Sequence, residues 1–305
     1  MYLTVDCAKL DNGVITLYEF YDITTDHDKK DYYSKKIKEL RKLSETVYII
    51  YYVSSENSNI NNISITKFSN GTKTDIFTKV DFDTFKEWYT SENGDNKGGH
   101  SKKFGFISDD GDKYIEKLLT KLVDCDLTTD NNGRKLIIPA LKSLETHFFD
   151  FDLLHSKNKF VIEFLKNESH IKKRAGKQNW DLSNGATHPN RYWGNNKRKF
   201  ITLWEATKIL NSELYLVSYS DDQDELLHLM KVDSISENGI ESDIGILLKY
   251  ENFIEWLKQM DKSSKDGSDY LNRQKFPSMV RDQEFWAQND SIWKKELNKF
   301  GGETK

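Results

Sequence analysis

Three charged residues lie on two neighbouring apolar segments near the middle of the chain. Asp152 lies in the first segment, Glu163 lies in the second, and Lys166 follows Glu163 three residues later. A carboxylate among apolar strand residues is costly unless it is paired or bound to a cation. Two carboxylates on adjacent antiparallel strands suit a hard divalent ion, which completes its shell with water and phosphate oxygens. The pattern therefore predicts Mg²⁺- or Mn²⁺-assisted chemistry on a phosphoryl group, with the lysine orienting a metal-bound water.

These residues need a strand pair between helices to bring them together. The alternating apolar residues predict strands at 148–154 and 159–165, and the helical spacing of apolar residues predicts helices at 135–147 and 198–211. A strand at 213–220 follows. Asp150 is an alternative to Asp152 as a metal ligand, because residues two apart on a strand share one face.

The order helix, Asp-bearing strand, Glu- and Lys-bearing strand, helix, strand resembles the PD-(D/E)XK nuclease superfamily over about residues 135–220. The resemblance implies that Asp152 and Glu163 bind metal, that Lys166 activates water, and that Glu145 on the preceding helix is an extra acid. It also implies phosphodiester hydrolysis. One departure is the spacing Glu163-x-x-Lys166, one residue longer than the family's acid-x-lysine. Lys166 would therefore point away from Glu163 unless a bulge interrupts the strand.

The same order of elements occurs once before in the chain. A hairpin over residues 5–20 again ends in Glu-Phe, and a helical stripe, a strand at 47–53 and a helix beginning near Phe82 follow. Glu19 then matches Glu163, Asp6 matches Asp150, and Asp22 replaces Lys166. We expect an α/β protein with a mixed sheet, built from two tandem duplicated units with the first degenerate. The expected divisions are 1–92, a connecting segment 93–133, the active unit 134–262, and a short helical tail 263–305.

The second copy carries a basic insertion that the first lacks. Between its hairpin glutamate and the next strand it is longer by 23 residues. Nine basic and two acidic residues give the segment 166–199 a net charge of +7, which favours contact with a phosphate backbone. Arg191 suits bidentate phosphate contacts, and Trp193 either stacks on a base or anchors the segment to the domain. The predicted nucleic-acid contacts are Lys172, Lys173, Arg174, Lys177, Arg191, Trp193, Lys197 and Arg198.

The bulk composition narrows the class of protein. The whole chain has a net charge of −4, so it is not a generally basic nucleic-acid binder. Two cysteines are too few for a disulfide framework or a cysteine zinc site. We see no secretory signal and no run of the roughly 20 apolar residues that a membrane span needs. A cytoplasmic protein without membrane contact is the expectation.

Two function classes follow from these observations. The leading hypothesis is a Mg²⁺- or Mn²⁺-dependent nuclease with one active site in the second copy, acting on nucleic acid, with DNA favoured over RNA. One active copy would nick one strand, so double-strand cleavage would imply a homodimer. The alternative is a non-catalytic interaction or regulatory protein, related to host or phage defence, on a nuclease-derived scaffold. The misplaced lysine and the net acidity favour this alternative.

Overall fold

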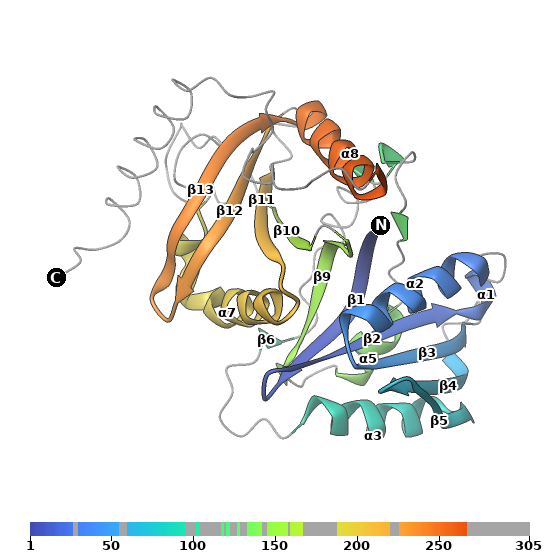
Figure 1. Cartoon of the computed structure of the whole chain (residues 1–305). Helices are drawn as coiled ribbons and strands as arrows, with labels where there is room; N and C mark the ends of the chain where they lie inside the picture. Colours follow the sequence, from blue (N-terminus) through green and yellow to red (C-terminus); the bar gives the residue numbers. More distant parts are fainter. Residues whose placement is uncertain are drawn as a thin grey trace. The chain divides into compact units, whose positions relative to one another are not determined.

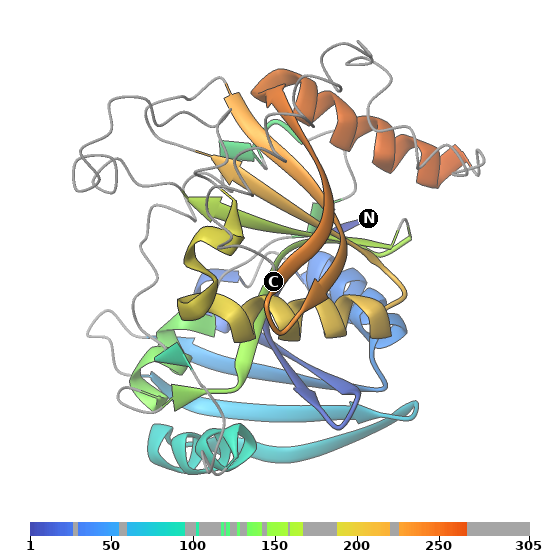
Figure 2. The ribbon, with the colours of Figure 1, turned by 90° about the vertical axis from the view of Figure 1, so that its left-hand side faces the viewer.

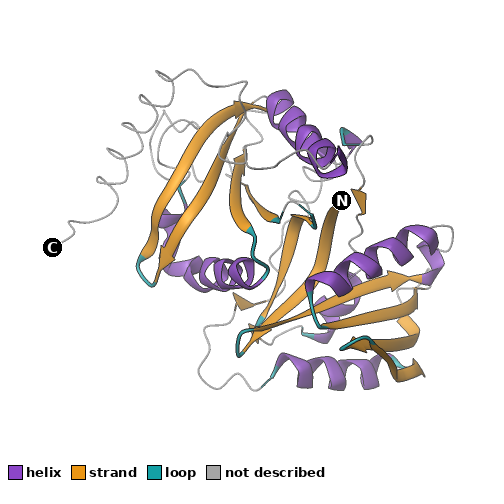
Figure 3. Ribbon diagram, in the orientation of Figure 1, coloured by secondary structure: helices purple, strands orange, loops and turns teal. Residues whose placement is uncertain are grey.

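The computed structural model describes residues 1–26, 30–54, 60–94, 102–103, 117–118, 120–122, 127–128, 133–141, 145–157, 159–166, 188–219 and 226–266 (Figures 1 and 3). Helices and mixed strands confirm the predicted α/β class. Residue contacts divide the chain into two units. The first unit comprises residues 2–108 and 127–156, and the second comprises Met1, 109–126 and 157–305. None of the described helices is long and apolar enough to cross a membrane.

The first unit is built on a mixed sheet in the order β9-β1-β2-β3-β4-β5. β1 and β2 are an antiparallel hairpin whose turn uses Asn12 and Gly13, both at positive φ, a conformation that Asn and Gly tolerate. β2 and β3 pair in parallel, and every other pairing along this order is antiparallel. The strand bounds are β1 Tyr2–Asp11, β2 Val14–Asp22, β3 Thr46–Ser54, β4 Ile60–Ser69, β5 Thr72–Val80 and β9 Phe148–His155.

Helices cover both faces of this sheet (Figure 1). α2 (Lys30–Leu43) packs on the face that bears Tyr21, whose ring centroid lies 3.8 Å from that of Tyr33. α3 (Phe82–Asn93) and α5 (Gly133–Ala140) share one buried cluster with Tyr18 and Phe20 on the opposite face. Asp81 caps α3 by accepting a hydrogen bond from the Thr84 N–H. The short elements are α1 Ile23–Asp26, β7 Leu127–Thr128 beside β1, and β6 Lys102–Lys103 paired with β8 Glu145–Thr146.

The second unit carries the strand order β10-β11-β12-β13. β10 (Phe160–Lys166) pairs in parallel with β11 (Glu213–Tyr219), and the antiparallel strands β12 (Leu226–Ser236) and β13 (Gly239–Lys249) follow. The 3-10 turn η3 (Pro189–Tyr192) leads into α7 (Trp193–Ile209), and α8 (Tyr250–Asp266) ends the described chain. α7 and α8 lie on opposite sides of these strands (Figure 2). Phe160 contacts Trp256 on the α8 side.

The two copies repeat both the order of elements and the pairing register. Leu17 pairs with Val47 in the first unit, and the matching Val161 pairs with Leu214 in the second. The buried positions Tyr33, Lys36 and Leu40 of α2 have the same spacing as Phe200, Leu203 and Thr207 of α7. Both copies therefore have a parallel crossover and bury the same side of the connecting helix, as the predicted duplication requires.

The boundaries between the copies differ from the expected ones. α5 and β9 belong to the first unit, although the sequence pattern placed them at the start of the second copy. The helix expected over 135–147 is shorter than predicted, because α5 ends at Ala140 and Glu145 and Thr146 pair with β6 in a short two-stranded sheet. Glu145 therefore lies on the strand β8 and not on a helix, which corrects its predicted position. The expected tail helix lies outside the described residues beyond Asp266.

Candidate functional site

Glu163 is the predicted site residue that the structure places in the most demanding environment. Its side chain is 2% exposed in the middle of the otherwise apolar strand β10. The carboxylate Oε1 forms an ion pair with the Nζ of Lys199, from the first turns of α7. Lys199 is 27% exposed, so one end of this pair is open to solvent. The ion pair offsets the cost of burying the carboxylate.

The first copy contains a matching pair in a sealed environment. Glu19, on β2, pairs through Oε1 with Lys36 of α2, and both side chains are 0% exposed. Lys36 aligns with Leu203, so in the second copy the lysine comes from Lys199, one helical turn earlier. The two copies therefore share a strand glutamate paired with a helix lysine, and only the second exposes the lysine.

Lys166 does not belong to this pair. β10 and β11 pair without interruption from Phe160 opposite Glu213 to Lys166 opposite Tyr219. The bulge that would turn Lys166 toward Glu163 is absent from this register, so the two side chains lie on opposite faces of β10. Lys166 is half-buried at the end of the strand. Among the described lysines, Lys199 makes the contact that the sequence pattern predicted for Lys166.

Asp150 and Asp152 lie on β9 in the first unit, and both are half-buried. β1 bulges where it passes β9: Val5 pairs with Phe151 and Ala8 with Phe149, leaving Asp6 and Cys7 opposite Asp150. Burial raises the pKa of the Cys7 thiol, and the nearby carboxylate charges of Asp150 and Asp6 raise it further. Asp6 also accepts a hydrogen bond from the Phe20 N–H at 3.1 Å. Asp150 and Asp6 therefore both lie near Cys7, on the neighbouring strands β9 and β1 of the first unit.

Asp22, which stands where the second copy has Lys166, ties three elements of the first unit together. Its Oδ2 accepts hydrogen bonds from Ser54 Oγ at 2.5 Å and from Lys135 Nζ at 2.9 Å, and its Oδ1 accepts one from the Thr24 N–H at 3.1 Å. Burial alone would raise the pKa of Asp22, but the hydrogen bonds from Ser54 and Lys135 outweigh it and the pKa is lowered. Asp22 therefore has a structural role: its hydrogen bonds stabilise the fold of the first unit.

The described end of the basic segment is anchored to the β12–β13 hairpin. Asn190 donates to the Ile240 carbonyl and accepts from the Ile240 N–H, each at 2.8 Å. His188 accepts from the Asn190 N–H at Nδ1, so its Nε2 carries the proton and donates to Asp243. Burial lowers the pKa of His228 on β12 to about 3.

Trp193 anchors the start of α7 to the same β12–β13 hairpin. Its side chain is buried, its ring stacks on Phe200 with centroids 5.7 Å apart, and its Nε1–H donates to the Glu237 carbonyl. A nucleic-acid base would have to displace Phe200 to stack there, so the contacts favour the anchoring role.

Lys197 forms an ion pair with Glu237, and Arg198 is exposed. Arg191 lies in η3. Lys172, Lys173, Arg174 and Lys177 lie outside the described residues.

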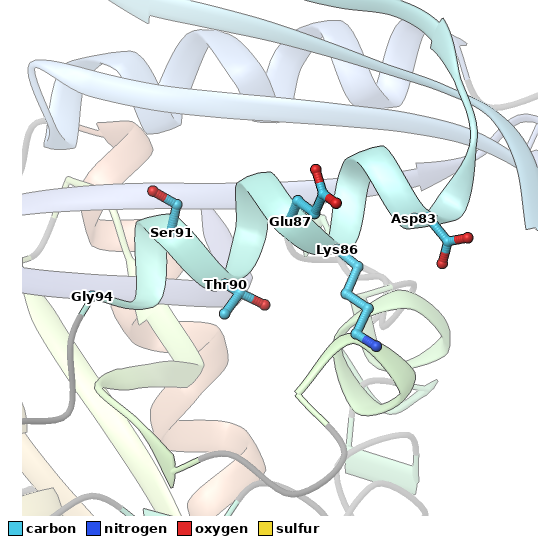
Figure 4. Close-up of a pocket in the computed structure, with 6 residues that line it drawn as sticks. All are labelled: Asp83, Lys86, Glu87, Thr90, Ser91 and Gly94. Atoms are coloured by element: carbon cyan, nitrogen blue, oxygen red, sulfur yellow. The ribbon is translucent and has the colours of Figure 1, made fainter.

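A hollow of about 890 Å³ lies against α3 in the first unit (Figure 4). Its described lining combines opposite charges, Asp83 and Glu87 against Lys86, along one helix. These side chains point in different directions and converge on no common point (Figure 4). The lining residues that the structure describes therefore do not have the arrangement of a catalytic site.

The donor groups match a hard divalent ion in type. Carboxylate oxygens are the ligands that Mg²⁺ and Mn²⁺ prefer, and Glu163 engages Lys199 through Oε1 of its two oxygens. Within the part of the chain that is described, no three His, Cys, Asp or Glu side chains gather into a metal-binding group. An ion at Glu163 would thus be held by few protein ligands, with water and substrate oxygens as the rest. This is a common arrangement for Mg²⁺.

Comparisons with known proteins found no matching family model, no similar curated protein and no similar solved structure.

Proposed function

We propose that the protein is a metal-dependent nuclease whose active site lies in the second copy, at Glu163. The observation that carries the proposal is the contrast between the two glutamate–lysine pairs. Lys36 is 0% exposed and Lys199 is 27% exposed. A lysine that serves a substrate must be reachable from solvent, whereas a sealed pair can only serve the fold. The basic segment that begins at Lys166 is also confined to the second copy.

In this proposal Lys199 takes the role that the PD-(D/E)XK resemblance assigns to Lys166. Its ammonium group lies against the Glu163 carboxylate, where it would orient a water molecule or stabilise the charge that develops on a phosphoryl oxygen. A bound Mg²⁺ or Mn²⁺ would polarise that oxygen and lower the pKa of the water. Glu163 would hold the ion together with water and substrate oxygens, and the role of Asp152 or Asp150, on β9 of the first unit, stays a prediction from the sequence. Arg198 and Lys197 would contact the phosphate backbone.

The test is cleavage of end-labelled DNA and RNA by the full chain in Mg²⁺, Mn²⁺ or EDTA. We expect metal-dependent cleavage that Glu163→Gln and Lys199→Ala each reduce by at least about 100-fold, the usual scale for a group acting on the transition state. Asp152→Ala and Asp150→Ala test whether either residue contributes to cleavage, as the sequence predicts. The proposal fails if Glu163→Gln and Lys199→Ala cleave as fast as the wild type.

Lys166→Ala is the matched control for Lys199→Ala. Both variants remove one lysine from the same unit, but Lys199 contacts Glu163 whereas Lys166 lies on the opposite face of β10. We expect Lys166→Ala to keep most of the cleavage rate. If Lys166→Ala reduced the cleavage rate more than Lys199→Ala, Lys166 and not Lys199 would belong to the site.

A second function is favoured by one observation. Because Glu19 and Lys36 form the same pair without any exposure, the pair itself is a scaffold feature that needs no ligand. An interaction protein on this scaffold would retain it. Such a protein would show no metal-linked stabilisation, whereas a site that binds metal only in the folded state adds about 2.7 kcal/mol at a hundredfold excess over Kd. Thermal unfolding in EDTA and Mn²⁺ separates the two functions.

A further inference from the structure

The exposed face of α2 in the first unit carries a concentration of positive charge. Lys35, Lys38, Arg41 and Lys42 are all exposed along this helix. Their spacing along the chain places them on neighbouring turns of one side, opposite the buried positions Tyr33, Lys36 and Leu40. The chain as a whole has a net charge of −4, so this face stands out against its surroundings. We call it the α2 basic face.

A pocket lies at the C-terminal end of this face. It has a volume of about 490 Å³ and is formed where α2, the start of β3 and the β4–β5 turn meet. Three cationic side chains and one acidic side chain line it, with small polar residues and one aromatic ring; its lining is Lys38, Arg41, Lys42, Ser44, Glu45, Phe68, Asn70 and Gly71. The balance of charge suits an anionic group.

The arginine of this pocket is held in position. The guanidinium carbon of Arg41 lies 4.7 Å above the centre of the Phe68 ring, which is cation–π geometry. Stacking leaves the edge of a planar guanidinium available for bidentate contact with phosphate oxygens. Lys42 forms an ion pair with Glu39 on the same helix, so Lys38 and Arg41 carry most of the local charge. The pocket thus presents a preorganised arginine beside a lysine on the same helix.

The opposite wall of the pocket leaves room for a ligand. The β4–β5 turn uses Asn70 and Gly71, both at positive φ, and the Asn70 N–H is hydrogen-bonded to the Glu45 carbonyl. A Cβ atom at Gly71 would meet no other atom within 4 Å. The turn is therefore fixed to the α2–β3 connection and open on its outer side.

We propose that the α2 basic face, with its pocket at Arg41 and Phe68, is a second contact site for the phosphodiester backbone of nucleic acid, contributed by the first copy. The choice of nucleic acid as partner rests on the proposed function. The face would make the first copy a binding module in addition to its structural role. A row of cations ending in a stacked arginine suits the regular spacing of backbone phosphates.

The test is binding of a fluorescently labelled DNA duplex to the full chain in EDTA, in the Glu163→Gln background, at several salt concentrations. The double variant Lys38→Glu/Arg41→Glu should raise Kd at least tenfold. Neutralisation by Lys38→Gln/Arg41→Gln should lower the slope of log K against log salt by about 0.9 for each phosphate that the protein no longer neutralises. The neutral pair also serves if the charge-reversed pair is less well folded, as judged by thermal unfolding.

The matched control is Lys79→Glu/Lys86→Glu, which makes the same change of net charge at exposed positions of the same unit. This variant should bind within about twofold of the parent, since its charges lie outside the pocket and are screened by salt. Equal weakening by both charge-reversed pairs, no weakening by either, or a parent that binds anionic lipid vesicles but no nucleic acid would each overturn the inference. Binding through Arg41 by the Glu163→Gln protein, combined with no cleavage by the wild-type chain in metal, would support this site and refute the nuclease.

Discussion

At the residue scale, the most informative groups are the two glutamate–lysine pairs, of which the first is fully buried and the second is partly exposed. Glu19 and Lys36 form an ion pair in which both side chains are fully enclosed. Removal of one partner from a buried ion pair costs about 3–5 kcal/mol, whereas replacement of both by apolar groups is often neutral. The pair is thus expected to act as one unit in the stability of the first unit.

We predict that Lys36→Met lowers the free energy of unfolding by about 3–5 kcal/mol, because it leaves the Glu19 carboxylate buried beside an apolar side chain. Lys36→Met combined with Glu19→Leu should recover most of this loss. Urea unfolding of the two single variants and the double variant measures the coupling. Additive effects of the two single changes would show that the residues do not stabilise each other.

A second prediction at this scale concerns Asp22 and pH. The folded-state pKa of Asp22 is lowered, so its stabilising contribution is present above the unfolded-state pKa of about 3.9 and is lost as pH falls through the folded value. Asp22→Asn should therefore be destabilising at pH 7, by roughly 1–3 kcal/mol. The difference from wild type should shrink below about pH 4. A difference that stays constant from pH 7 to pH 3 would show that the charge of Asp22 does not matter.

The sequence allowed part of this residue-scale account to be predicted. Glu163 was identifiable because a carboxylate inside an apolar strand needs a partner. Its partner Lys199 could not be identified from the sequence, because it comes from a helix whose phase relative to the sheet depends on tertiary packing. Lys36 offered a signal, since it occupies a buried position of α2 between Tyr33 and Leu40. A lysine at such a position indicates a buried acid facing it.

At the element scale, the parallel crossover from β10 through α7 to β11 positions the proposed site. η3 and the first turn of α7 are held to the β12–β13 hairpin by Asn190, His188 and Trp193. Lys199 lies just after these contacts, so the hairpin fixes the end of the helix that supplies the lysine. Gly239 permits this approach, because a Cβ there would lie 2.9 Å from Asn190 Oδ1.

We predict that Asn190→Ala removes both hydrogen bonds to Ile240 and lowers the stability of the second unit by about 1–3 kcal/mol. Amide hydrogen exchange at the start of α7 should become faster, because the anchored turn opens more often. Asn196→Ala, a half-buried position of α7, serves as the control. Equal exchange rates in wild type and Asn190→Ala would show that the hairpin contact does not hold the helix.

Helices and strands were easier to predict than the limits of the units. The alternating apolar residues of β9 and β10 and the stripes of α2 and α7 indicated their types and approximate ends. The helix over 135–147 was wrong at its C-terminal end because Glu145 and Thr146 pair instead with Lys103 and Lys102 in a two-stranded sheet. The assignment of α5 to the first unit depends on Leu136 and Ile137 packing with Phe20. That contact is between residues far apart in sequence, which local patterns do not reveal.

At the scale of the whole molecule, the two copies differ in the exposure of their ion pairs. The first copy seals its pair and has the structural Asp22 in place of Lys166, while the second has a half-buried lysine and the basic insertion. With one active site per chain, the proposed nuclease cuts one strand per binding event. We predict that supercoiled plasmid is first converted to the nicked form, with linear product later and second order in protein. Gel analysis over time measures this, and simultaneous appearance of both products would contradict a single site.

The most direct test of the central claim compares matched substitutions in the two copies. Cleavage of labelled DNA in Mn²⁺ would be measured for wild type, Glu163→Gln and Glu19→Gln, at a temperature where thermal unfolding shows all three to be folded. We predict that Glu163→Gln loses cleavage by at least about 100-fold, whereas Glu19→Gln retains it within a few-fold. Retained cleavage in Glu163→Gln, or equal loss in both variants, would contradict the assignment of the active site to the second copy.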